Sequence, residues 1–146
     1  MNWRIVVVGK PALSWAQDGV LDYLNRINKK SKIEMIYLRN ESRERTEKAM
    51  LAAADKYLCI ALDERGKQMR STGLAGWIKD RELSGNKRVC ILIGGSDGLS
   101  EKLLSSVQES WSLSSFTLQH ELALVVLLEQ IYRAYSILRG DPYHRE

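Results

Sequence analysis

The chain has 146 residues, of which 45% are hydrophobic and 27% are charged. This length suits one domain over residues 1–146, and the composition argues against disorder, a coiled coil or a collagen-like rod. The net charge of +4 is uneven, because residues 1–88 contribute +7 and residues 89–146 contribute −3. This asymmetry indicates that a polyanion is met mainly by the first part of the chain, although a solvated basic face explains it equally well.

Strands and helices alternate along the chain, as short β-branched runs are followed by amphipathic stretches. Strands are predicted at residues 3–8, 32–38, 57–62 and 87–93. Helices are predicted at residues 14–27, 46–54, 71–82, 100–108 and 121–138. Residues 39–45 read as a charged linker before Thr46 as an N-cap, and residues 113–118 read as a short extended piece.

This alternation predicts an α/β fold, a three-layer domain around a mostly parallel sheet, because strands joined by helices pair in parallel through right-handed crossovers. Strands that are apolar on both faces, such as residues 90–93, are typical of a sheet covered by helices on both sides. In such sheets, ligands bind beyond the carboxyl ends of the strands. This rule selects the segments 63–70, 94–99 and 113–120 as the ligand crevice.

Neither a membrane segment nor a metal site is expected. The apolar stretch near the C-terminus, residues 122–128, falls far short of the roughly 20 residues of a membrane span, and residues 5–8 read as a strand rather than as a secretion signal. Cys59 and Cys90 lie inside apolar runs, with no partner at metal-ligand spacing. We therefore expect a cytoplasmic protein with two buried, reduced thiols.

The glycine-rich segment Gly94-Gly95-Ser96-Asp97-Gly98 joins a predicted strand to a helix. Glycine lets a ligand approach the backbone, and a helix N-terminus offers free N–H groups. The spacing fits neither the dinucleotide fingerprint nor a P-loop, and residues 38–40 lack the acidic residue that would hold a ribose. An oxidoreductase that uses a dinucleotide is therefore disfavoured, and a simple tight turn stays an alternative to a cofactor site.

Small hydroxyl residues alternate with apolar ones over residues 110–118. This pattern fits an edge strand with one solvated face, and it fits equally an extended loop whose backbone groups bind the edge of an adenine ring. The sequence alone leaves both interpretations open.

Polar side chains with potential chemistry gather in the last helix and the tail. Glu129 and Arg133 are four residues apart, so they share one helix face, either as a surface ion pair or as part of a site. Tyr143 and His144 fall among the last four residues, where a frayed end is the simpler interpretation.

At these residues the sequence resembles the bacterial 23S rRNA pseudouridine N3-methyltransferases of the SPOUT class, along the whole chain. The motifs that support the resemblance are Leu62-Asp63 with Gly66-Lys67, Leu92-Ile93-Gly94-Gly95 with Gly98-Leu99-Ser100, Trp111-Ser112-Leu113-Ser114, Leu118 with His120, Glu129-Gln130-Ile131-Tyr132-Arg133-Ala134, and Pro142-Tyr143-His144-Arg145-Glu146. Ser96-Asp97 and Leu124 depart from the family pattern, and Leu124 stands where many relatives have an arginine, which puts one phosphate or dimer contact in doubt.

The resemblance implies a C-terminal trefoil knot, a homodimer whose subunits both shape the active site, and S-adenosylmethionine as the cofactor. The implied cofactor-binding residues are Leu62, Gly94, Leu113, Ser114, Ser115, Phe116, Thr117 and Leu118. The implied catalytic residues are Arg133, His144, Tyr143 and Glu129, with Arg133 as a source of positive charge and His144 as a candidate proton acceptor.

The implied activity is methylation of N3 of a pseudouridine in 23S rRNA, on the assembled 70S ribosome, without a metal. A non-catalytic ribosome-binding protein that keeps the fold is the alternative.

Overall fold

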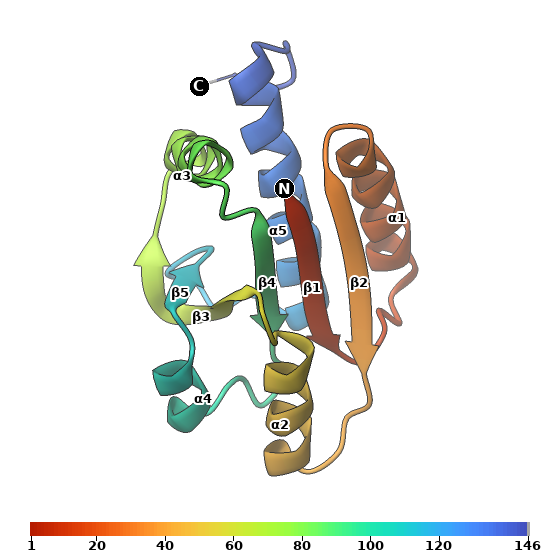
Figure 1. Ribbon diagram of the computed structural model, residues 1–146. Helices are drawn as coiled ribbons and strands as arrows, with labels where there is room; N and C mark the ends of the chain where they lie inside the picture. Colours follow the sequence, from red (N-terminus) through yellow and green to blue (C-terminus); the bar gives the residue numbers. More distant parts are fainter. Residues whose placement is uncertain (146) are drawn as a thin grey trace.

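The computed structural model describes residues 1–145, in which five strands and five helices alternate (Figure 1). The strands are β1 (Asn2–Val8), β2 (Lys32–Leu38), β3 (Leu58–Gln68), β4 (Arg88–Ile93) and β5 (Glu109–Ser112). The helices are α1 (Ser14–Asn28), α2 (Arg43–Ala53), α3 (Ser71–Ser84), α4 (Glu101–Ser106) and α5 (His120–Arg139).

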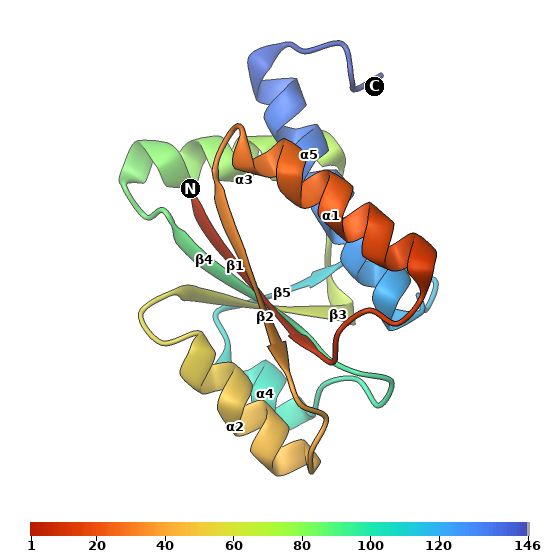
Figure 2. The ribbon, with the colours of Figure 1, turned by 90° about the vertical axis from the view of Figure 1, so that its right-hand side faces the viewer.

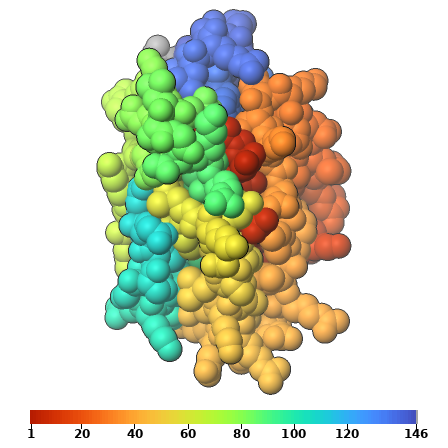
Figure 3. Space-filling model, in the orientation of Figure 1, coloured from red at the N-terminus to blue at the C-terminus, as the bar shows by residue number. Residues whose placement is uncertain are grey.

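The strands form one parallel sheet in the order β2-β1-β4-β3-β5. Figure 2 shows α1, α3 and α5 above this sheet and α2 and α4 below it, so the predicted three-layer α/β fold is confirmed. In the space-filling view of Figure 3, α2 and α4 lie side by side over the lower part of the face, and the end of α5 forms the top.

Alternating side chains of each central strand enter two separate cores. In β1, Trp3, Ile5 and Val7 pack against α1, α3 and α5, whereas Val6 and Val8 pack against α2 and α4. Since successive side chains point to opposite faces of a strand, a sheet buried on both sides needs apolar residues at every position. This requirement explains why the central strands read as continuous apolar runs.

Helix α2 begins at Arg43, earlier than predicted, so the segment 39–45 is only partly a linker. Its N-cap is Ser42, whose hydroxyl accepts a hydrogen bond from the backbone N–H of Arg45 at 3.3 Å. Thr46 lies within the helix and its hydroxyl accepts from the N–H of Glu41 at 3.2 Å. Both residues are good N-caps one turn apart, and the prediction chose the wrong one.

Strand β3 is longer than predicted, because it pairs with β5 in two separate stretches. After a register shift beyond Leu62, the strand resumes, so that Lys67 lies opposite Trp111 and Gln68 opposite Ser112. The predicted loop 63–70 is therefore mostly strand, which is a correction.

Strand β5 ends at Ser112, so the predicted extended piece at residues 113–118 is also wrong. These residues form a loop. The edge-strand interpretation of the hydroxyl-rich run holds for its beginning only, since β5 lies at one edge of the sheet. Helix α4 is shorter than predicted and follows the N-cap Ser100.

Helices α1 and α5 pack against each other so closely that a Cβ added to Gly19 would lie 3.2 Å from Val125. At their N-terminal ends, the buried carboxylate of Glu121 accepts hydrogen bonds from the N–H groups of Ala12 and Leu13, at 2.7 and 3.0 Å. Leu124 is fully buried in the core. Position 124 therefore lies in the core of this chain and not on a surface that meets solvent.

The two cysteines are unpaired and buried, as predicted. Burial raises the pKa of the Cys59 thiol to about 11 and that of the Cys90 thiol to about 12. Both thiols are therefore protonated and unreactive at neutral pH. Among residues 1–145, no helix is long and apolar enough to cross a membrane.

Candidate functional site

A cavity of about 650 Å³ lies beyond the carboxyl end of β4, where the strand-end rule places a ligand, and beside the middle of β3. Its walls come from residues 62–65 of β3, from the glycine loop (residues 94–100), from the loop after β5 and from the first residues of α2, α4 and α5. The lining residues are Arg43, Leu62, Asp63, Glu64, Arg65, Ile93, Gly94, Gly95, Ser96, Asp97, Gly98, Leu99, Ser100, Glu101, Leu113, Ser114, Phe116, Thr117, Leu118, His120 and Ala123.

Seven of the eight residues predicted to bind a cofactor line this cavity, which brings together segments that are far apart in the sequence. Ser115 is the exception, since it is not among the lining residues. The neighbouring Phe116 has 80% of its surface exposed, so the rim of the cavity carries an apolar ring open to solvent.

The glycine loop owes its shape to its own backbone. The N–H of Gly98 donates to the carbonyl of Gly95 at 3.0 Å, and Gly98 has a φ of +70°, which favours glycine. A Cβ added to Gly94 would lie 3.0 Å from the carbonyl group of Gly98 and from the side chain of Leu99. A side chain at position 94 would crowd the loop, so glycine suits the fold of the loop, and its role in the close approach of a ligand stays a prediction.

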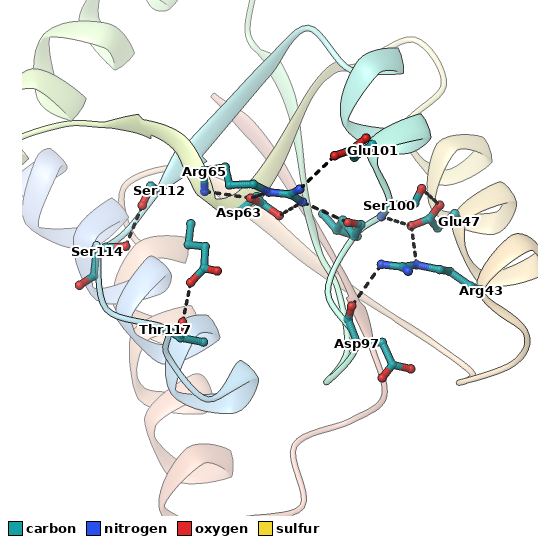
Figure 4. Close-up of polar contacts among 12 residues, drawn as sticks. Arg43, Glu47, Asp63, Arg65, Asp97, Ser100, Glu101, Ser112, Ser114 and Thr117 are labelled. Carbon is teal, nitrogen blue, oxygen red and sulfur yellow. Dashed lines mark hydrogen bonds and ion pairs between the residues drawn. The ribbon is translucent and has the colours of Figure 1, made fainter.

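Strand β3 is hydrogen-bonded to both cavity loops, the glycine loop and the loop after β5 (Figure 4). On one side, the Thr117 hydroxyl donates a hydrogen bond of 2.6 Å to the carboxylate of Glu64. On the other side, the Arg65 guanidinium donates to the carbonyl of Leu99 at 3.3 Å. The same guanidinium donates hydrogen bonds to both carboxylate oxygens of Asp63, at 2.8 and 3.0 Å. These hydrogen bonds lower the pKa of that carboxyl.

The loop after β5 is held by serine hydroxyls (Figure 4). Ser112 donates to the carbonyl of Ser114 at 2.8 Å, and the Ser114 hydroxyl accepts from the N–H of Phe116 at 2.9 Å. These short-range bonds fix the backbone at the wall of the cavity, in a conformation that leaves the sheet.

Three of the four residues predicted to be catalytic, Glu129, Arg133 and Tyr143, form a second cluster, and His144 lies next to it in the chain. None of the four is among the residues that line the cavity. The Arg133 guanidinium lies 2.7 Å from the carboxylate of Glu129. That carboxylate also accepts a hydrogen bond from the Tyr143 hydroxyl at 3.2 Å, and Tyr143 shares a 2.9 Å hydrogen bond with Tyr23 of α1. Burial, the Tyr23 hydrogen bond and the nearby Glu129 charge raise the pKa of Tyr143, which keeps its phenol protonated.

The tail is folded back on the helices of its own chain. The ring of Tyr143 packs edge to face on Tyr132 at 4.7 Å between centroids, and His144 Nδ1 lies 3.4 Å from the Ser136 hydroxyl. At the root of the tail, Lys30 pairs with Asp141 at 2.6 Å. Glu146 lies outside the described residues.

Cavity and tail are at opposite ends of the molecule. Figure 1 shows the tail at the end away from the arrowheads of β1, β2 and β4. Helix α5 connects the two, and its run from His120 to Arg139 corresponds to roughly 30 Å at the rise of an α-helix. The residues described for the tail therefore do not reach the cavity of their own chain.

Arg43 is a cavity residue that the sequence did not indicate as part of a cofactor site. It stands at the first position of α2 and its guanidinium donates to the carbonyl of Asp97 at 3.1 Å. In a parallel α/β sheet, a helix that follows a strand begins at the carboxyl edge. A sequence prediction that began α2 at Arg43 would therefore have placed this side chain near the crevice.

Comparison with known proteins identifies relatives along the full length of the chain. Residues 1–144 match the family of predicted SPOUT methyltransferases. A protein named ribosomal RNA large subunit methyltransferase H from Deinococcus radiodurans is 36% identical over 145 residues, covering 99% of each chain. Proteins of the same name from Polynucleobacter asymbioticus and Prochlorococcus marinus are each 40% identical, and the matches cover 100% and 92% of those chains and 100% and 98% of this one.

Solved structures share the fold at low sequence identity. A probable methylase family protein from Haemophilus influenzae has a TM-score of 0.57 and 11% identity, over 99% of this chain and 71% of that chain. The SpoU methyltransferase AviRb from Streptomyces viridochromogenes, solved in complex with its cofactor AdoMet, has a TM-score of 0.50 and 13% identity, over 92% of this chain and 58% of that chain. These likenesses extend to the fold alone.

We expect Asp63→Asn to lower stability in a pH-dependent way. The folded state lowers the pKa of Asp63, so the carboxylate stabilises the fold above its unfolded pKa of about 4, and this contribution is lost as the pH falls through the folded pKa. Urea unfolding should show a deficit of about 1 kcal/mol at pH 7 that shrinks as the pH falls below the unfolded pKa and disappears once the pH is below the folded pKa. Asp55→Asn, at an exposed turn, is the matched control. A deficit that is equal at pH 7 and pH 3 would contradict this account.

We expect Gly94→Val to reduce the affinity for S-adenosylmethionine at least about tenfold, because the new side chain collides with Gly98 and Leu99 and displaces the loop. Calorimetry measures the affinity, and circular dichroism checks that the variant is folded. Gly76→Ala is the control, since a Cβ there meets no atom within 4 Å. Unchanged affinity in a folded Gly94→Val protein would place the cofactor elsewhere.

Proposed function

Because this chain belongs to the SPOUT methyltransferase family, we propose that it transfers the methyl group of S-adenosylmethionine to N3 of a pseudouridine in 23S ribosomal RNA. The observation that carries the proposal is the full-length match, at up to 40% identity, with proteins named ribosomal RNA large subunit methyltransferase H. The pseudouridine target, the assembled 70S ribosome as substrate and a cytoplasmic location rest on the family resemblance of the sequence.

The cavity suits the cofactor in size and chemistry. Its volume of about 650 Å³ falls within the range of small-molecule pockets. Leu62, Leu113 and Leu118 would offer apolar surface to an adenine ring, and the polar groups of the glycine loop would face the rest of the molecule. Bound S-adenosylmethionine supplies a methyl group on a positively charged sulfur, so the protein must position a nucleophile in line with it.

The nucleophile must lose a proton in the reaction. N3 of pseudouridine is an imide nitrogen that carries a proton at neutral pH, and this proton must leave before or during methyl transfer. In the proposal, the Arg133 guanidinium stabilises the negative charge that develops on the ring carbonyls, and the His144 imidazole accepts the proton. Glu129 orients Arg133 through their 2.7 Å ion pair, and Tyr143 contacts the base.

A homodimer would bring these groups to the cofactor. The catalytic cluster lies far along α5 from the cavity of its own chain, so we infer that the tail serves the cavity of a second copy. Large apolar side chains are exposed near the N-terminal ends of α1 and α5, where a partner would cover them. They are Leu13, Trp15, Phe116 and Leu122.

The trefoil knot belongs to the same proposal and rests on family membership. Within the segment involved, the paired strands β3 and β5 approach closely at a register shift, since a Cβ on Gly66 would lie 2.6 Å from the backbone of Ser110. Only glycine allows two backbones to approach so closely.

Methyl transfer to isolated ribosomal particles tests the activity. With labelled S-adenosylmethionine, we expect label on N3 of a 23S pseudouridine in 70S ribosomes and none in 30S particles, which lack this RNA. His144→Ala should lower the single-turnover rate by at least about a hundredfold while ribosome binding changes little, because proton removal belongs to the chemical step. Tight cofactor binding with no methyl transfer to any particle would favour the alternative, a non-catalytic ribosome-binding protein.

Mixing two inactive variants tests whether the tail acts on the partner. Gly94→Val damages the cavity, and deletion of residues 143–146 removes the tail. In a mixed dimer, the deleted chain still has its cavity and the other chain still has its tail, so one site is complete. We expect equal mixing and re-association to restore about a quarter of the wild-type activity, since half of the dimers are mixed.

The control mixture pairs the deletion variant with a chain that carries both changes, and it should stay inactive. Sedimentation equilibrium checks that the wild-type chain is a dimer at micromolar concentration. No recovery of activity from a mixture that forms dimers would assign the tail to its own chain.

A further inference from the structure

The glycine loop has two faces, and only one of them borders the large cavity. Its other face borders a small cavity of about 50 Å³ that is closed by α2, with Thr46, Glu47 and Met50 among its walls. The loop therefore separates the two cavities, and its conformation depends on its contacts with α2.

Glu47 of α2 binds the end of the glycine loop. Its carboxylate accepts a hydrogen bond from the backbone N–H of Ser100 at 2.8 Å and a second, short one from the Ser100 hydroxyl (Figure 4). The side chain is only 14% exposed, so both bonds are shielded from water. The Ser100 hydroxyl in turn accepts from the N–H of Leu103 at 3.1 Å, which fixes the end of the loop to the start of α4.

Arg43 adds a second tether one turn earlier on α2. Its guanidinium lies 3.7 Å from the Glu47 carboxylate and donates to the carbonyl of Asp97. The glycine loop is thus attached to one helix face at two points, Asp97 and Ser100, with Glu47 in contact with both Ser100 and Arg43 (Figure 4). Without these bonds, the three glycines at positions 94, 95 and 98 would leave the loop free to take many conformations.

We propose that Glu47 is a positioning residue for the cofactor pocket, which it shapes by fixing the glycine loop without lining the large cavity. This inference rests on the proposed function, since it takes the large cavity as the cofactor site. A ligand that binds one loop conformation loses affinity in proportion to the time the loop spends elsewhere. Loss of the Glu47 carboxylate should therefore weaken cofactor binding, even though the side chain lies on the α2 side of the loop and does not line the large cavity.

Calorimetry with S-adenosylmethionine on the full-length protein tests this role. We expect Glu47→Ala to weaken binding roughly tenfold or more, and Glu47→Gln to weaken it less, because its carbonyl oxygen can still accept from the Ser100 N–H. Glu44→Ala, an exposed glutamate in the first turn of the same helix, should bind as the wild type does. Ser100→Ala should lose most of its effect in a chain that already carries Glu47→Ala, because both changes break the same contact.

Amide hydrogen exchange without cofactor gives a readout that a general loss of stability would not produce. Glu47→Ala should speed exchange in residues 94–100 and leave the strands unchanged. Ile27→Val, a core change in α1 that lowers the melting temperature, should not single out this loop. Unchanged cofactor affinity in Glu47→Ala would overturn the positioning role, whatever the loop exchange shows.

The same measurements separate this inference from the proposed function. If the wild-type chain binds no S-adenosylmethionine, the proposed function fails, and the exchange data alone decide whether Glu47 holds the loop. If the wild type binds the cofactor and Glu47→Ala binds it equally well, the proposed function stands and the positioning role is rejected.

Discussion

Burial of the parallel sheet on both faces is the constraint on which the rest of this structure depends. Parallel pairing sends every connection across one face or the other, so each helix starts near the carboxyl edge of the sheet. The apolar runs of β1 and β4 satisfy this arrangement by supplying side chains to two cores at once. As a result, the loops after β4 and β5 meet the middle of β3 and the start of α5, and together they enclose a cavity that no single segment could form.

Hydrogen bonds from charged side chains fix the loops that the apolar cores do not hold in place. The loops at the carboxyl edge are rich in glycine and serine, which pack poorly and have many accessible conformations. Glu64 and Arg65 of β3 hydrogen-bond to the two cavity loops from the sheet, whereas Arg43 and Glu47 hydrogen-bond to the glycine loop from α2. Each of these side chains is charged and reaches a backbone or hydroxyl group, so the hydrogen bonds are of the stronger kind.

The sequence predicted the features that arise from local patterns. The strands and long helices follow from apolar periodicity, and the cavity-lining residues follow from the strand-end rule together with the family resemblance. Ser42 and Thr46 could not be ranked as N-caps from sequence, because the choice depends on where Glu41 and Arg43 find partners. The length of β3 depends on pairing with β5, some 45 residues away, and local propensity carries no information on such a contact.

Helix α5 also sets a distance between sites. It begins at the cavity and ends at the tail, so its 20 residues set a distance of about 30 Å between the cavity proposed for the cofactor and the tail proposed for the base. If two such helices ran in opposite directions across a two-fold axis, the tail of each chain would lie beside the cavity of the other. Two catalytic centres would then stand about one helix length apart, and a large RNA particle could present its target to only one of them at a time.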